Sequence, residues 1–166
     1  MSERAGGIRL GVWIPMVIVV LDQITKAVVR QTLALHESIT VVPGFLDFTH
    51  IRNTGAAFGF LDAAEVPYKT VLLSAVAVAS LLGVAFYAAS LPREHRVARW
   101  GLALILGGAA GNLIDRVSAG FVVDFVDVYW RTYHFWAFNV ADSAITVGVV
   151  LWLLDTVTTH HVSQAA

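Results

Sequence analysis

Residues 71–89, VLLSAVAVASLLGVAFYAA, form an uninterrupted run of apolar and small residues without one charged side chain. A run of about 20 such residues is long enough to cross the hydrocarbon core of a bilayer as a helix. Inside a bilayer every backbone polar group must be bonded within the protein, which restricts spanning structures to helices and closed barrels. Charged residues make up 14% of the chain, whereas soluble domains carry about 25%. We therefore expect an integral membrane protein.

Three further apolar segments accompany this run. Four transmembrane helices are therefore expected, at about residues 10–29, 70–89, 97–115 and 140–157. Basic residues indicate their orientation, because loops rich in Lys and Arg stay on the cytoplasmic side. Such residues precede the first helix and crowd the loop between the second and third: Arg4, Arg9, Arg93, Arg96 and Arg99. Both termini and this loop are expected to be cytoplasmic.

The loops on the opposite side, at about residues 30–67 and 117–138, are rich in β-branched and aromatic residues. Residues 38–42 and 46–52 are expected to be strands, because Pro43-Gly44 between them favours a turn. Residues 120–128 could add a strand to the same sheet. The chain, residues 1–166, is thus predicted to be a single domain. Its fold class is an all-α membrane protein of four transmembrane helices with a small β-rich extracytoplasmic subdomain.

Two aspartates stand among apolar neighbours, Asp124 in FVVDF and Asp142 in FNVADSAIT. Burying an uncompensated carboxylate is unfavourable, but two that lie together can share one proton, and such a pair can activate a water molecule. The predicted topology places the other intramembrane polar groups at the same outer level: Asp22, Lys26, Asn112, Asp115 and Arg116. Intramembrane ionisable residues are candidates for function, and their common depth predicts one site.

Simpler interpretations stay open for several of these residues. Asp22 and Lys26 are four apart and could be an ion pair that makes the helix insertable. Asp115 is expected to pair with Arg116 at the helix end. Asn139 has the spacing of an N-cap for the fourth helix, which would place Asp142 at the third helical position.

Five motifs in order resemble those of the bacterial lipoprotein signal peptidase (signal peptidase II) family. They are DQITK at residues 22–26, NTGAAF at 53–58, GGAAGNLIDR at 107–116, VVDF at 122–125 and FNVADS at 138–143. The glycine of NTGAAF could mark only a turn, and that motif alone is weak. Together with four expected helices, the set is specific and extends over nearly the whole chain.

The resemblance implies an intramembrane aspartic endopeptidase of the bacterial inner membrane, with its site near the outer face. Such an enzyme removes the signal peptide from diacylglyceryl-modified prolipoproteins, cleaving just before the lipid-modified cysteine. Asp124 and Asp142 would be the catalytic pair. The motif residues that would support the site or bind substrate are Asp22, Lys26, Asn53, Gly55, Asn112, Arg116, Asn139 and Ala141. Membrane lipids and globomycin-type inhibitors are the other partners implied, and a monomer is expected.

Other functional classes fit less well. The 11 basic and 12 acidic residues give no sign of a nucleic-acid partner. No cofactor or metal is expected, because the chain has no cysteine and no histidine pair at helical spacing within an apolar segment. A proton-coupled transporter would favour acids spread through the membrane depth, and a scaffold would leave Asp124 and Asp142 without a purpose.

The position of Asp142 leads to one further expectation. At the third residue of a helix its carboxylate would lie near backbone N–H groups that lack helical partners. We therefore expect Asp142 to be the ionised member of the pair in the free enzyme, and Asp124 to hold the shared proton.

Overall fold

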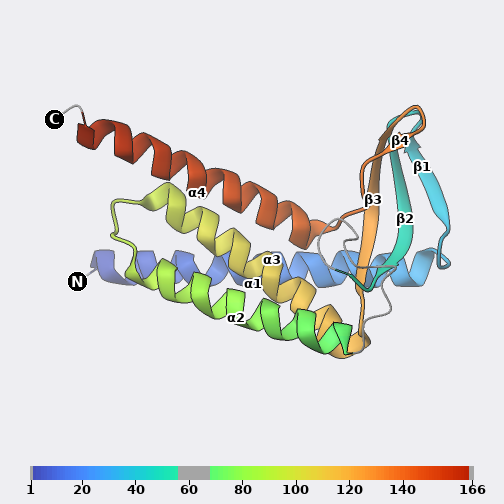
Figure 1. Ribbon diagram of the computed structural model, residues 1–166, viewed down its shortest axis with the longest axis horizontal. Helices are drawn as coiled ribbons and strands as arrows, with labels where there is room; N and C mark the ends of the chain where they lie inside the picture. Colours follow the sequence, from blue (N-terminus) through green and yellow to red (C-terminus); the bar gives the residue numbers. More distant parts are fainter. Residues whose placement is uncertain (1, 56–67, 165–166) are drawn as a thin grey trace.

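The computed structural model describes residues 2–55 and 68–164. It contains four helices, α1 (Ser2–Thr32), α2 (Lys69–Ser90), α3 (Arg96–Ala119) and α4 (Val140–Gln164), with a small sheet at one end of the bundle (Figure 1). Each of the four is long and apolar enough to cross a membrane. The predicted fold class is therefore confirmed. Both termini lie at the end of the bundle opposite the sheet (Figure 1).

Two helices extend beyond the apolar segments that predicted them. Helix α1 begins at Ser2 rather than near residue 10, and α4 continues to Gln164 rather than ending near residue 157. Hydropathy marks only the part of a helix that lies in hydrocarbon, whereas polar residues such as Arg, Gln and Ser can prolong the helix in water. The polar ends of these two helices therefore could not be located from the apolar pattern of the sequence.

Helix α3 is the centre of the bundle, because it packs against α1, α2 and α4. Its buried face consists mainly of small residues, which let neighbouring backbones approach closely. A Cβ atom added at Gly148 of α4 would lie 2.5 Å from the carbonyl oxygen of Gly101 in α3, and one added at Gly107 would lie 2.8 Å from Ile18 Cβ in α1. The close packing of α3 therefore depends on glycine at these crossings.

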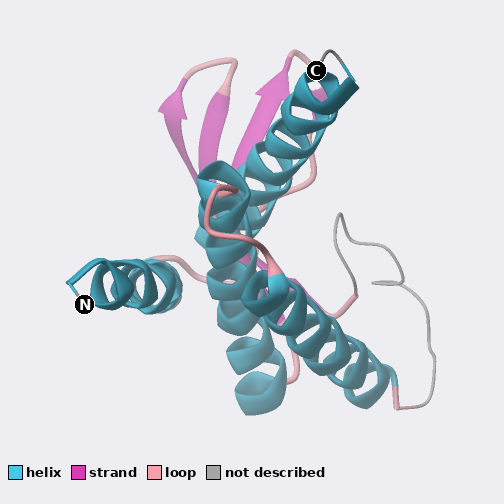
Figure 2. Cartoon of the chain, turned by 90° about the vertical axis from the view of Figure 1, so that its left-hand side faces the viewer, coloured by secondary structure: helices cyan, strands magenta, loops and turns pink. Residues whose placement is uncertain are grey.

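The sheet has the strand order β1-β2-β3-β4, with β1 (Ser38–Val42), β2 (Leu46–Asn53), β3 (Val122–Trp130) and β4 (Tyr133–His134) all antiparallel. The view from the end with the termini shows the strands at the far end of the helices (Figure 2). Gly44 turns the chain between β1 and β2 with a φ of 79°. In the β2–β3 pair, Ile51 lies opposite Asp124 and Asn53 opposite Val122. The register therefore brings Asn53 beside Asp124.

A small apolar cluster joins the sheet to the end of α1. It consists of Val29 of α1, Leu33 directly after that helix, and Val123 and Phe125 from β3. The ring Nδ1 of His50 in β2 also lies 3.0 Å from the carbonyl oxygen of Leu33. The two apolar strand residues on either side of Asp124 are thus packed against the helix, which fixes the strand that carries the aspartate.

The glycine crossing leads to a prediction about stability. Gly148→Ala should lower the stability of the purified protein by about 1–3 kcal/mol, because the added methyl group meets backbone atoms that can move only if the helices separate. The thermal midpoint in detergent measures this. Gly83→Ala in α2 is the matched control, since a Cβ there meets no atom within 4 Å. Equal midpoints for the two variants would contradict the close-packing argument.

Candidate active site

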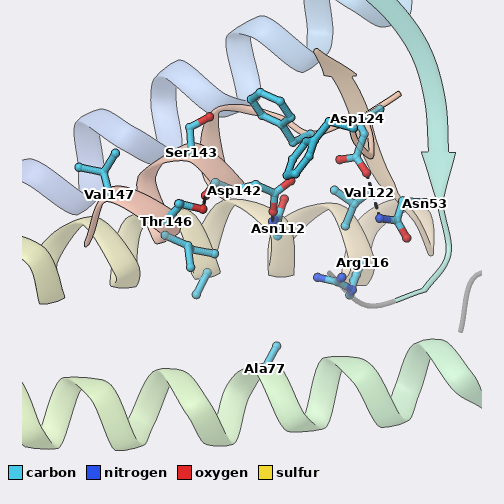
Figure 3. A pocket seen from close by; sticks show the side chains of 15 residues that line it. Asn53, Ala77, Asn112, Arg116, Val122, Asp124, Asp142, Ser143, Thr146 and Val147 are labelled. Carbon is cyan, nitrogen blue, oxygen red and sulfur yellow. Dashed lines mark hydrogen bonds between the residues drawn. The ribbon is translucent and has the colours of Figure 1, made fainter. Parts of the chain in front are cut away.

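A cavity of about 600 Å³ lies beside the sheet end of the bundle, between α2, α3 and α4. Asp124 from β3 and Asp142 from α4 both line it, together with Asn53, Asn112 and Arg116 (Figure 3). Ala77 faces these residues from α2 across the cavity (Figure 3). Segments that are distant in sequence therefore converge at one hollow.

Asp124 is almost completely buried, with 3% of its surface exposed. Its Oδ2 accepts a hydrogen bond from Asn53 Nδ2 at 2.9 Å, and its Oδ1 accepts one from Asn139 Nδ2 at 2.7 Å. Burial, and then the charge of Asp142, raise the pKa of Asp124 to about 7. The two amide donors and the more distant Lys26 charge oppose that rise only in part. A carboxyl group with this pKa can change protonation state near neutral pH.

Asp142 lies at the third position of α4, as the capping interpretation predicted. The side-chain oxygen of Asn139 accepts the Asp142 backbone N–H at 2.9 Å, and Asp142 Oδ2 accepts the Asn139 backbone N–H at 3.3 Å. This reciprocal pair is a capping box with aspartate in the place of glutamate. Asp142 Oδ1 also accepts from Asn112 Nδ2 at 2.8 Å.

Asn139 does more than cap the helix. Its side-chain nitrogen donates to Asp124 while its side-chain oxygen and backbone N–H bond to Asp142. It is also completely buried. One residue therefore bridges the two aspartates and holds both carboxyl groups relative to the start of α4.

The predicted pair of Asp22 and Lys26 is present, with 2.8 Å between Asp22 Oδ2 and Lys26 Nζ, and both side chains are completely buried. The prediction for Asp115 was wrong. Its carboxylate pairs with Lys26 at 3.0 Å and with Arg30 at 3.7 Å rather than with Arg116. Consecutive residues on a helix point in different directions, so Asp115 faces α1 while Arg116 faces the cavity.

Arg116 holds the chain that carries Asn53. Its Nη2 donates to the carbonyl oxygen of Gly55 at 3.1 Å, and the Gly55 backbone N–H donates to Asn53 Oδ1 at 2.9 Å. Asn53 in turn donates to Asp124. The remaining residues of the NTGAAF motif, 56–58, lie outside the described residues.

Sequence reasoning missed several residues near the site. Gln23 donates its side-chain nitrogen to Asp22, Asp115 and the Gly111 carbonyl, each at 3.2 Å. Ser143 and Thr146 of α4 line the cavity. Thr146 could have been found, because it is four residues after Asp142 and so shares a helix face with it. The contacts of Gln23 with Asp115 and Gly111 depend on the packing of α1 against α3 and have no signal in sequence.

Residues 14–158 match the model of the family described as signal peptidase (SPase) II. The chain is 50% identical over 136 residues to a lipoprotein signal peptidase of Geobacter metallireducens, covering 82% of this chain and 83% of that protein. It is 48% identical over 148 residues to one of Syntrophotalea carbinolica, covering 88% and 89%.

Solved structures of bacterial membrane enzymes share the fold. One superimposes with a TM-score of 0.78 at 30% sequence identity, covering 89% of this chain and 87% of that chain. A second has a TM-score of 0.75 at 31% identity, covering 87% and 90%. From the match over most of its length, the chain belongs to the signal peptidase II family.

Proposed function

We propose that Asp124 and Asp142 are the catalytic pair with which this signal peptidase II removes signal peptides from prolipoproteins. The observation that carries the proposal is that both carboxyl groups face one cavity while Asn139 bridges them. Their direct hydrogen-bond donors, within residues 2–55 and 68–164, are amide N–H groups rather than cations. Neutral donors leave a carboxyl group free to exchange its proton.

Hydrolysis of a peptide bond requires an activated water and a polarised carbonyl group. In the proposed reaction, ionised Asp142 takes a proton from the attacking water while protonated Asp124 donates a hydrogen bond, and then its proton, to the substrate. The pKa of Asp124 near 7 supports this assignment, because the group keeps its proton under mildly acidic to neutral conditions.

The substrate would be a prolipoprotein that already carries diacylglycerol on the cysteine that follows the cleavage site. The cavity supports this, because its lining combines the polar cluster with apolar residues of α4, namely Ile145 and Val147, that lie further along a candidate membrane span. A peptide bond could thus reach the carboxyl groups while acyl chains stay in the bilayer.

We also propose an orientation in the bacterial inner membrane. The termini and the loop with Arg93 lie at the end of the bundle opposite the sheet (Figure 1). The excess of basic residues there favours the cytoplasmic side, which would put the catalytic pair at the outer face. A monomer that contacts membrane lipids and binds globomycin-type inhibitors in the same cavity completes the proposal. Asp22, Lys26, Asn53, Gly55, Asn112, Arg116, Asn139 and Ala141 are its proposed supporting residues.

The first test replaces each aspartate. Asp124→Asn and Asp142→Asn should each reduce cleavage of a diacylglyceryl-modified prolipoprotein peptide by at least about 10²–10⁴-fold, the usual contribution of acid–base catalysis. Both variants should still fold. Asp127→Asn is the matched control, because Asp127 is also on β3 but pairs with His134. Full activity of either aspartate variant would refute the assignment.

The second test is the pH dependence of kcat/KM. Burial raises the pKa of Asp124 to about 7, so the protonated acid should be lost as the pH rises through about 7. Activity should then fall by about tenfold per pH unit above that value. The sign follows because the raised pKa extends the protonated range upward. A rate that stays constant from about pH 6 to about pH 9 would contradict Asp124 as the acid.

The third test concerns Arg116. Arg116→Ala should lower both folding yield and activity, because hydrogen bonds from charged groups contribute about 1.5–3 kcal/mol and this one anchors Gly55 beside Asn53. Thermal midpoint and cleavage rate measure the two effects. Exposed Arg93, changed to alanine, is the control. A variant at Arg116 that behaves like the control would remove this residue from the supporting set.

A further inference from the structure

The residues immediately before the two aspartates are held in the same way. The backbone N–H of Val123 donates to Asp115 Oδ2 at 3.2 Å. The backbone N–H of Ala141 donates to Asp22 Oδ1 at 3.0 Å. Each segment that presents a catalytic aspartate is therefore bonded to a buried carboxylate that does not line the cavity.

These two carboxylates share one cation. Lys26 Nζ lies 2.8 Å from Asp22 Oδ2 and 3.0 Å from Asp115 Oδ2, and its side chain is completely buried. Its third hydrogen bond, at 2.9 Å, goes to Asn112 Oδ1, and the Asn112 side-chain nitrogen donates to Asp142. Arg30, at 3.7 Å from Asp115, supplies a second positive charge. With Arg30 counted, the two carboxylates are balanced by two cations, and this neutrality favours their burial.

The contact at Val123 fixes β3 from the side that β2 does not cover. In an antiparallel pair, successive residues of a strand direct their N–H and C=O groups to opposite edges. The backbone of Val123 meets the side chains of Asp115 and Asn139, with its N–H on the former and its C=O on the latter. On the other edge β3 pairs with β2, where Asp124 lies opposite Ile51. Next to Asp124, strand β3 is therefore bonded along both edges, to β2 on one side and to the side chains of Asp115 and Asn139 on the other.

We propose that the cluster of Lys26, Asp22 and Asp115 is a brace that sets the relative position of the two catalytic segments. In it Lys26 and Asp115 are positioning residues that act through Val123 and Ala141 without touching the substrate. The inference deepens the proposed function and rests on it. It also gives Asp115, which does not line the cavity, a part in the reaction.

The brace has an electrostatic consequence that a purely structural contact would lack. Among the described residues, the charged groups that act on Asp124 are Lys26 from α1, Arg116 from α3 and Asp142 from α4, while β2 contributes the neutral Asn53. Asp115 of α3 accepts from the adjacent Val123 and pairs with Lys26. The charge of Lys26 lowers the pKa of Asp124. Removing that charge should raise this pKa, whereas removing the Asp115 charge should lower it by leaving Lys26 less compensated.

The experiment compares Asp115→Asn with Lys26→Met in the full-length protein. Asp115→Asn keeps an acceptor for Val123 but removes the charge. It should lower kcat about tenfold to a hundredfold with KM changed by less than about threefold, as expected when reacting groups are displaced slightly. In Asp115→Asn the loss of activity at alkaline pH should begin at a lower pH than in the parent protein, because the pKa of Asp124 falls. In Lys26→Met the loss should begin at a higher pH, because that pKa rises.

Lys26→Met leaves Asp22 without its ion-pair partner and Asp115 with Arg30 at 3.7 Å, so this variant can fail to fold. The double variant Lys26→Met with Asp115→Asn removes one charge of each sign, so its thermal midpoint should exceed that of Lys26→Met alone. Asp155→Asn is the matched control, because it breaks an ion pair with His95, at 2.6 Å, that involves neither catalytic segment. The control should keep the parent kcat and pH profile.

A readout independent of cleavage separates the brace from the catalytic assignment. Amide hydrogen exchange at Val123 should accelerate in Asp115→Ala, which has no acceptor, and less in Asp115→Asn. This holds even if Asp124→Asn proved active and the proposed function failed. The brace is overturned if exchange at Val123 is unchanged in Asp115→Ala. It is also overturned if Asp115→Asn retains the parent kcat, or loses kcat with the alkaline limb unmoved.

Discussion

The buried ammonium group of Lys26 is the constraint on which the arrangement of the helices depends. A charge removed from water costs several kcal/mol unless its partners surround it closely. Lys26 meets this condition only because Asp115 of α3 comes within 3.0 Å and Asp22 within 2.8 Å. Such an approach needs a small residue at the crossing, since a Cβ on Gly111 would lie 2.7 Å from Asp22 Oδ2. The burial of these charges thus depends on the glycine-rich face of α3, which lets α1 approach closely enough for the ion pairs to form.

The same cluster explains why α4 begins where it does. The first N–H groups of a helix have no partner within it, and here side chains from outside the helix accept two of them. Asp22 takes the Ala141 N–H, and Asn139 takes the Asp142 N–H. The helix start is therefore bonded to α1 and, through Asn139, to Asp124 of β3. The hydrogen bonds that satisfy the free N–H groups at the start of α4 therefore also set the relative position of Asp124 and Asp142.

Sequence alone predicted what depends on local pattern. Strand β1 coincides with residues 38–42 because branched residues end at Pro43-Gly44, and the capping role of Asn139 followed from its spacing to Asp142. The two-residue strand β4 has no comparable pattern. The partner of Asp115 was mistaken because adjacency in sequence suggested Arg116, whereas the observed partner Lys26 comes from another helix. Membrane depth could group these polar residues, but only the packing of α1 on α3 decides which of them touch.

Charged and neutral partners are separated within this site, and the separation has a chemical reason. Behind the cavity, Lys26 and Asp22 form a direct ion pair. At the cavity, the carboxyl groups of Asp124 and Asp142 are met by the amides of asparagines. An amide donor orients a carboxylate but stabilises its charge less than a cation does. Proton transfer requires a group that can exist in either state. A cation in contact with Asp124 would hold this carboxyl group ionised. Lys26 instead contacts Asn112 and the carboxylates behind the cavity. It can therefore fix the position of Asp124 and leave the proton of Asp124 free to move.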